Sequence, residues 1–502
     1  MTAAAPSFSV ERRSVSIIGG LLVVSVVLLF GSIFWLFSGQ NLALLQIPLV
    51  LLSLMLVMMT GLLYIINPPK QMGAALLTVI YFTLDLTLRQ GLVQGGGADA
   101  QSIVKGLIGI FLFGFGLFNG LQRVFRHPIL GLFFIYAGYA AFSASYSSTM
   151  ALAVGSGLTL LGIVFVVAKT ATEDRTGVMR LWTYIYAAAA LAAVLSLGLL
   201  AAVPNMARDF SDPGAFRLRG ITGNANSLGP MMAVGFLISL LMIKCAPTPR
   251  WKWIHRFSAL ALITALAITN SRATIIGLAG SLAMSFFITH QMGIIGVLLL
   301  LMVGTMAMAM MLNPDLLASV LGVFAELFSR SGSVQELTSL TGRSSIWDAC
   351  WLLIKEKPFV GYGLGSVRVE LPKVFYDQWG NSAATAHNFL LESMISVGLI
   401  GTLPLVVMLV MMTAGLWRYV GSGAKAYGLD LQERAMALCA FQILCMFWIQ
   451  SMVERSFSGM ASPTTVSLGL CITTCVYLLL NKPHPLRHSQ PGYTFARPAR
   501  ST

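Results

Sequence analysis

The feature that most constrains this chain is a series of long apolar runs separated by short polar connections. An α-helix needs about 20 apolar residues to cross a bilayer, and inside the bilayer its backbone polar groups pair with one another. About fourteen runs approach or reach this length. They lie at 15–37, 42–66, 71–88, 103–121, 128–144, 149–168, 178–203, 226–244, 254–269, 272–289, 293–312, 387–416, 435–453 and 463–480. Since 57% of the residues are hydrophobic and only 10% are charged, we predict an all-α polytopic membrane protein with about fourteen transmembrane helices.

The first apolar run is interpreted as a membrane anchor that stays in place. It is longer than the core of a signal peptide, and no clear small-residue cleavage site accompanies it. The runs and connections predict six segments. These are a cytoplasmic tail (1–14), N-terminal transmembrane helices (15–203), central transmembrane helices (204–312), a long periplasmic loop (313–386), C-terminal transmembrane helices (387–480) and a cytoplasmic tail (481–502).

The positive charge of the chain indicates its orientation. The net charge is +14. With both termini in the cytoplasm, the whole excess falls on the cytoplasmic side, for example between Lys244 and Arg256, and the charges of the outer side balance. Cytoplasmic loops of membrane proteins carry such an excess of lysine and arginine. The charge therefore predicts a topology rather than a nucleic-acid partner.

Patterns for metal or nucleotide binding are missing from the sequence. Of the six cysteines only Cys350 lies in the outer loop, so neither a disulfide framework nor a CxxC zinc pattern is predicted. The sequence contains no Walker pattern. Gly361-Tyr362-Gly363-Leu364-Gly365 does not match GxGxxG and is better explained as a tight turn that returns the chain to the membrane. We expect no metal and no cofactor, so the energy for any reaction has to come with the substrate.

One connection, 313–386, is long and polar, and it enters the outer compartment in this topology. Apolar residues recur at helical spacing over 316–329 and 345–357. The second stretch places Trp347 and Trp351 on its apolar face. Such helices suit the membrane–water interface, and packing on the transmembrane bundle is an equally good explanation. Either arrangement gives a structured loop that can act as a lid.

Arginines on the outer side need an explanation, because the positive-inside rule does not predict them. Arg217 and Arg219 precede the span 226–244, Arg272 lies between two spans, and Arg343 precedes the second loop helix. A guanidinium forms forked bonds to phosphate, which makes it a natural ligand for a diphosphate. Each arginine alone could anchor a loop or contact lipid headgroups. The set, together with the histidine described next, favours a binding site.

A single histidine, His387, lies on the outer side at the start of the span 387–416. The other five are assigned to the cytoplasmic side and are His127, His255, His290, His484 and His488. Imidazole can accept a proton near neutral pH, so His387 is a candidate base, and a capping or interfacial role is the alternative. Glu392 lies about 140° from it on a regular helix and is therefore not expected to orient it. Asn388 and Glu392 share a face, and we expect them to support the site or the helix packing.

The order of these motifs resembles that of the bacterial O-antigen ligase and polysaccharide polymerase superfamily. The motifs are Arg-Leu-Arg-Gly with Gly-Asn-Ala-Asn (217–226), Ser-Arg (271–272), Thr-Gly-Arg-Ser-Ser-Ile-Trp (341–347), Lys-Pro-Phe-Val-Gly-Tyr-Gly-Leu-Gly (357–365) and His-Asn-Phe-Leu-Leu-Glu (387–392). The resemblance covers roughly residues 215–400. The combination is more specific than any single motif, and the first six spans carry no motif of the family.

The resemblance implies an inner-membrane glycosyltransferase of the GT-C type whose active site faces the periplasm. Its donor would be a glycan linked to undecaprenyl diphosphate, and its acceptor a hydroxyl of another glycan or of lipid A–core. His387 would be the general base, Arg272 with Arg217 or Arg219 would hold the diphosphate, and Arg343 would position donor or acceptor. The resemblance implies no metal. Inner-membrane lipids, a flippase and a chain-length regulator are further candidate partners.

The chemistry agrees with these roles. A sugar–diphosphate bond leaves negative charge on the leaving group as it breaks, and fixed arginines stabilise that charge. A base on the acceptor hydroxyl completes a direct displacement, with inversion at the anomeric carbon.

Several functions stay open. A polymerase joins one lipid-linked repeat to another, whereas a ligase transfers the finished chain to lipid A–core. Thr-Gly-Arg-x-x-Ile-Trp and Pro-x-x-Gly-Tyr-Gly look more like the polymerases, and transfer to protein is a third option. A lipid-linked glycan flippase would place charged groups at the bilayer midplane and show repeat symmetry. The ionisable residues of this chain gather at the outer face instead, which disfavours a flippase.

Overall fold

The computed structural model describes residues 69–86, 100–209, 216–289, 343–376, 383–421 and 427–482. Within these ranges the regular elements are helices, accompanied by two isolated β-bridges. The α-helices are α3 (Pro69–Thr83), α4 (Ala100–Val124), α5 (Pro128–Ser143), α6 (Met150–Ala171), α7 (Arg175–Ala202), α8 (Pro204–Ala207), α9 (Ala225–Cys245), α10 (Pro249–Thr269), α11 (Arg272–Thr289), α15 (Arg343–Glu356), α16 (Val367–Val374), α17 (Phe389–Val420), α18 (Leu431–Ser451) and α19 (Pro463–Asn481).

The prediction of an all-α polytopic membrane protein is confirmed. Among the described residues, eight helices are long and apolar enough to cross a membrane, and two shorter apolar helices lie within α3 and α4. Every predicted span inside the described ranges coincides with one of the helices. The predicted spans 15–37, 42–66 and 293–312, and the loop helix at 316–329, lie outside the described residues.

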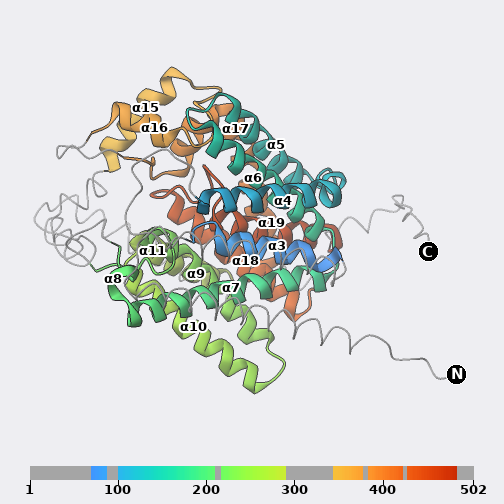
Figure 1. Cartoon of the computed structure of the whole chain (residues 1–502). Helices are drawn as coiled ribbons and strands as arrows, with labels where there is room; N and C mark the ends of the chain where they lie inside the picture. Colours follow the sequence, from blue (N-terminus) through green and yellow to red (C-terminus); the bar gives the residue numbers. More distant parts are fainter. Residues whose placement is uncertain are drawn as a thin grey trace, which may run out of the picture.

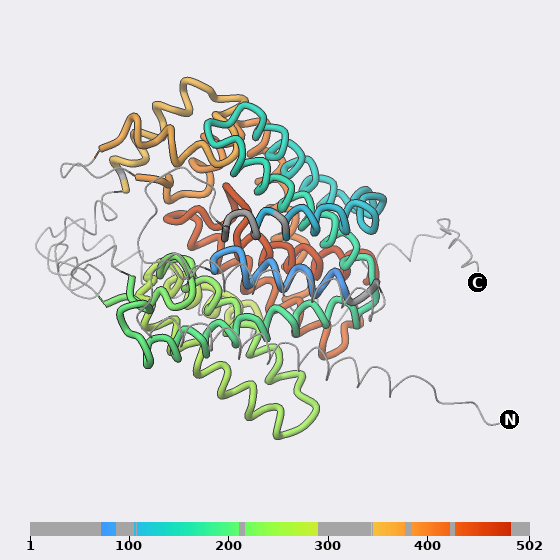
Figure 2. Tube along the Cα trace, in the orientation of Figure 1, coloured from blue at the N-terminus to red at the C-terminus, as the bar shows by residue number. Residues whose placement is uncertain are grey.

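The helices pack as a bundle in which neighbours in sequence are often not neighbours in space (Figure 1). α4 lies against α6, α5 against α17, and α11 against α18. α18 and α19 are the most enclosed spans, and Figure 2 shows them running through the middle of the molecule. Because both are apolar on most faces, burial on all sides is the stable arrangement for them.

Connections from distant parts of the chain meet at one end of this bundle. The amide of Leu218 donates to the carbonyl of Ile268, which joins the α8–α9 connection to the end of α10. The hydroxyl of Ser147 donates to the carbonyl of Leu364, which joins the α5–α6 connection to the loop before α16. In the predicted topology, this is the outer end.

The loop helices α15 and α16 pack on the first half of α17 and form a small apolar core of their own (Figure 1). Cys350 and Ile354 are buried in it. α15 is the predicted helix 345–357, but it already includes Arg343. The two tryptophans have different environments. Trp347 is half-buried and its indole N–H donates to the carbonyl of Ala386 at 3.1 Å, whereas Trp351 is 52% exposed.

The long helix α17 is interrupted at Gly398, whose φ of 59° and ψ of −168° are not helical. An interrupted helix leaves carbonyls and amides without partners, and in a membrane each of these is costly. The segment 358–363 supplies the partners. The carbonyls of Pro358 and Phe359 accept from the amides of Leu399 and Ile400. The amides of Tyr362 and Gly363 donate to the carbonyls of Ile395 and Ser396.

The glycines of Gly361-Tyr362-Gly363-Leu364-Gly365 make this contact possible. Gly361, Gly363 and Gly365 all have positive φ, as the prediction of a tight turn requires. A Cβ on Gly361 would lie 2.7 Å from the amide nitrogen of Gly398. The two backbones therefore touch without side chains between them.

Candidate active site

The site begins where α10 ends and α9 starts. Asn270 adopts the left-handed conformation, which asparagine tolerates, and ends α10. The guanidinium of Arg217 donates through Nε to the last α10 carbonyl, that of Thr269, at 3.3 Å. A cation at this position also compensates the partial negative charge of the helix C-terminus. Arg217 is thereby fixed and buried, and its Nη2 donates to Oδ1 of Asn226 at 2.5 Å.

Arg219 points in a different direction from Arg217. Its Nε donates to the carbonyl of Met206 at 3.0 Å. Burial lowers the pKa of the Arg219 guanidinium, and the nearby carboxylate of Asp209 offsets part of this effect. Asp209 also accepts from the amide of Ala225, the first residue of α9, at 2.9 Å. Arg219 thus belongs to the group of residues that fixes the N-terminus of α9.

The start of α17 holds His387 in place. Asn388 is the N-cap, and its Oδ1 accepts from the amides of Leu390 and Leu391. Its Nδ2 donates to the carbonyl of Met452 in the α18–α19 connection at 3.0 Å. His387 itself has a φ of 49°. A left-handed histidine is uncommon and persists only where its surroundings fix it.

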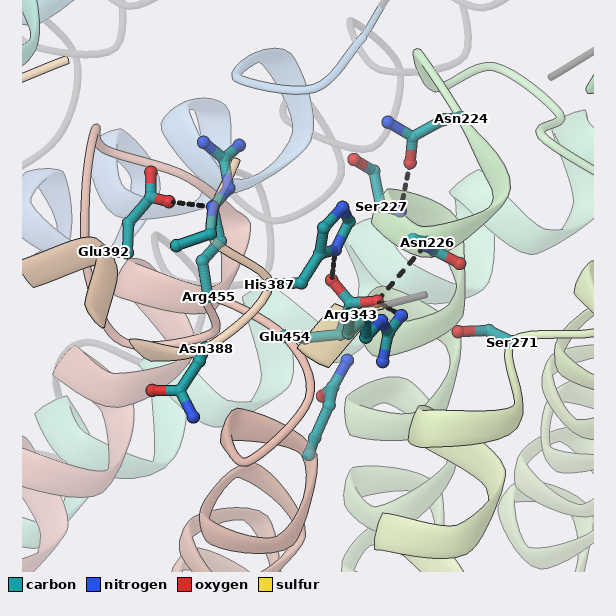
Figure 3. A network of polar contacts seen from close by, with 12 residues as sticks. Asn224, Asn226, Ser227, Ser271, Arg343, His387, Asn388, Glu392, Glu454 and Arg455 are labelled. Carbon is teal, nitrogen blue, oxygen red and sulfur yellow. Dashed lines mark hydrogen bonds and ion pairs between the residues drawn. The ribbon is translucent and has the colours of Figure 1, made fainter. Parts of the chain in front are cut away.

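Glu454, in the α18–α19 connection, brings the separate parts together. Its Oε2 lies 3.3 Å from Nδ1 of His387. Its Oε1 accepts from Nη2 of Arg343 at 2.9 Å and from Nδ2 of Asn226 at 3.3 Å. Figure 3 shows these three contacts converging on one carboxylate. Side chains from the first turn of α9, from α15, from the start of α17 and from the α18–α19 connection therefore form one network.

The charges in this network determine the state of Glu454. Burial raises the pKa of its carboxyl, but the hydrogen bond to His387 and the charges of His387, Arg343 and Arg455 outweigh burial, so the pKa is lowered. Glu454 is therefore ionised near neutral pH. An ionised carboxylate only accepts hydrogen bonds, so Nδ1 of His387 is the donor. In the neutral form of the ring, a proton on Nδ1 leaves Nε2 as the nitrogen that can accept a proton. The side chain of His387 is 30% exposed.

The structure places the other sequence-predicted residues as follows. Arg343 lies in the network, and Arg217 reaches it through Asn226. Arg272 is the first residue of α11 and follows Ser271, whose side chain packs closely on Gly229 of α9. Glu392 is buried and does not pair with His387. Its Oε2 accepts from the amide of Ala386 at 2.8 Å and so holds the chain just before His387.

Two members of the network, Glu454 and Asn226, were not predicted as partners of His387. Asn226 was recognised only as part of the Gly-Asn-Ala-Asn motif. Glu454 follows directly after a predicted span, and its neighbour Arg455 is another outer-side arginine of the predicted topology. An acidic residue at that position was the available signal. In the described part of the chain, no three His, Cys, Asp or Glu side chains form a group suited to a metal ion.

Fold and site together define an integral membrane protein with a network of polar side chains at one end of a helical bundle. Residues 257–406 match the protein family described as O-antigen ligase. This match supports the resemblance to the O-antigen ligase and polymerase superfamily that the motifs predicted. The match includes α11, α15, α16 and the start of α17, and hence Arg272, Arg343 and His387. No curated protein matches the chain.

Proposed function

We propose that the chain is an inner-membrane glycosyltransferase that acts at the periplasmic face. It transfers a glycan from undecaprenyl diphosphate to a hydroxyl of an acceptor sugar. The observation that carries this proposal is the pair of His387 and Glu454, surrounded by arginines at the end of a membrane bundle. This arrangement combines an imidazole base with fixed positive charge, and the match to the O-antigen ligase family supports the class of reaction.

In the proposed reaction, Nε2 of His387 takes the proton of the acceptor hydroxyl. The hydroxyl oxygen bonds to the anomeric carbon of the donor, and the bond from that carbon to the diphosphate oxygen breaks. The electron pair stays on undecaprenyl diphosphate, where arginines stabilise the charge as it develops. Attack from the opposite side inverts the anomeric configuration. A general base of this kind contributes about 10² to 10⁴ in rate.

Among the arginines, we assign the diphosphate to Arg217, Arg272 and Arg343. Arg217 is chosen over Arg219 because its side chain lies in the network of Asn226 and Glu454. Arg219 is directed to Met206 and Asp209 and serves the start of α9. Asn388 and Glu392 hold His387 through the cap of α17 and through Ala386.

We favour a polysaccharide polymerase, which joins lipid-linked repeats, because of the motifs at 341–347 and 358–363. Ligation to lipid A–core is the second candidate, since the matching family is described by that activity. In either case the lipid-linked donor, the acceptor glycan and the inner-membrane lipids are the partners, and both termini lie in the cytoplasm.

The test is the glycan profile of a deletion strain complemented with wild type, His387→Ala or His255→Ala. His255 is the matched control, because it contacts Tyr186 and Trp251 away from this network. We expect His255→Ala to restore the profile and His387→Ala to fail at equal membrane abundance. Single repeats without long chains mean a polymerase, and long chains retained on undecaprenyl diphosphate mean a ligase. Full activity of His387→Ala contradicts the proposal.

A further inference from the structure

A second group of charged residues adjoins the His387 network and is not assigned to the donor diphosphate. The segment before α16 packs against the end of α5, where the amide of Leu364 donates to the hydroxyl of Ser143 at 3.1 Å. A Cβ on Gly365 would lie 3.2 Å from the sulfur of Met460 in the α18–α19 connection. A Cβ on Gly459 would lie 3.3 Å from Oε1 of Glu392. The start of α16, the α18–α19 connection and the first turn of α17 therefore meet at one place.

Two arginines lie at this place. Arg368, in the first turn of α16, is exposed, and Arg455, in the α18–α19 connection, is half-buried. Loss of water around the guanidinium and the charge of Arg455 lower the pKa of Arg368. The carboxylates of Glu392 and Asp85 act in the opposite direction. The two side chains start from segments that meet here, so this place carries two positive charges.

The nearby acids compensate these charges only in part. Glu392 is buried and already accepts from the amide of Ala386. Within the described ranges, neither the Arg368 nor the Arg455 guanidinium makes a hydrogen bond or an ion pair. Two neighbouring guanidiniums that retain their donors are suited to binding a phosphate group.

The position of Arg455 relative to His387 indicates what this pair of arginines could bind. Arg455 directly follows Glu454 in the chain, yet Figure 3 shows its guanidinium on the opposite side of the His387 ring from Arg343 and Asn226. The base therefore has arginines on both sides. A general base in a displacement lies next to the acceptor hydroxyl, with the donor leaving group farther away.

We propose that Arg368 and Arg455 form a second anion site, which holds the phosphate group of a lipid-borne acceptor while the first set of arginines holds the donor diphosphate. This inference rests on the proposed function and adds the acceptor class to it. A polymerase acceptor carries its own diphosphate, and lipid A also carries phosphates, so both acceptors share the chemistry that this site recognises.

The experiment counts the undecaprenyl diphosphate molecules bound to the purified full-length chain by native mass spectrometry. We expect wild type to bind two molecules. The double variant Arg368→Gln/Arg455→Gln should lose the molecule at the second site, and Arg343→Gln should lose the molecule at the donor site. Loss of charge-assisted hydrogen bonds should weaken the affected site roughly tenfold or more. Lys373→Gln is the matched control, because it removes an exposed positive charge from α16, and it should retain both molecules.

A second arm identifies the source of the phosphate. Displacement of one bound molecule by phosphorylated lipid A from wild type, but not from the double variant, assigns the site to lipid A. Without displacement, the site belongs to a second undecaprenyl-linked glycan. Arg368→Lys/Arg455→Lys keeps both charges and should restore binding, which distinguishes a binding defect from misfolding. Two molecules on the double variant overturn this inference alone, whereas a wild-type chain that binds none contradicts the proposed function.

Discussion

Glu454 connects side chains that are far apart in the sequence, because it contacts Asn226, Arg343 and His387 at once. Sequence reasoning could identify His387 and Arg343 as candidates, since a lone histidine and outer arginines are visible without a structure. Helical geometry predicts that Glu392 does not pair with His387, and in the structure Glu392 instead accepts from the amide of Ala386. Local spacing says nothing about a residue on another connection, so Glu454 required the tertiary structure.

Replacement of Glu454 should show that it positions His387. Glu454→Gln keeps the size of the side chain but removes the charge that fixes the proton on Nδ1. We expect turnover to fall about 100-fold, within the usual range for a general base, with a smaller change in KM for the donor. Initial rates of glycan transfer by purified protein measure both quantities. Asp348→Asn, on the exposed side of α15, is the control. An unchanged kcat for Glu454→Gln removes Glu454 from the mechanism.

The lowered pKa of Glu454 also predicts how stability depends on pH. The ordinary value of this carboxyl is 4.5, and the folded value lies below it. A depressed pKa stabilises the fold above the unfolded pKa, and this contribution is lost as the pH falls through the folded pKa. The Tm of wild type should therefore exceed that of Glu454→Gln from about pH 5 to 8. The difference should decline only in more acidic buffer. A decline that begins near neutral pH contradicts this assignment.

At the scale of the element, α17 combines a predictable helix with an unpredictable interruption. Its apolar run has the length of a span, which is a local property, and the sequence predicts it correctly. Gly398 lies inside that run and looks like any helical glycine. Its role depends on the segment 358–363, which comes from a different part of the chain and pairs with the interrupted backbone. The interruption also leaves the part of α17 before Gly398, which follows His387, to be oriented by packing against that segment and α15.

A methyl group at the interruption should be poorly tolerated. A Cβ on Gly398 would lie 2.2 Å from the carbonyl oxygen of Phe359, and its backbone conformation is one that only glycine adopts readily. We expect Gly398→Ala to cost about 3 kcal/mol or more of stability. Gly131→Ala is the matched control, because its Cβ would have no atom within 4 Å and alanine favours a helix. Thermal unfolding of the purified proteins measures the effect. Equal Tm values for Gly398→Ala and wild type would show that the interruption is not fixed by this contact.

At the scale of the whole molecule, the alternation of spans predicts which connections share a side. In the predicted topology, the connections that carry Arg217, Arg272, His387 and Glu454 all lie on the outer side. The structure brings these connections to one end of the bundle. Sequence alone predicts a side because charge bias and span counting are sums over many residues, and this orientation stays a prediction. The sequence could not assign the contacts, because the packing of α5 on α17 and of α11 on α18 has no signature in either helix.

The orientation of this end is itself testable with single cysteines. Tyr376, after α16, is 66% exposed, and Trp253, near the start of α10, is 56% exposed. Five of the six native cysteines are buried and Cys245 is half-buried, so the background is low. A membrane-impermeant maleimide should label Tyr376→Cys in intact spheroplasts and Trp253→Cys only after lysis, because the two positions lie on opposite sides of the predicted membrane. Wild type measured under both conditions gives the background, and Cys245 should add to it only after lysis. The reverse pattern would put the His387 network in the cytoplasm, where a periplasmic donor could not reach it.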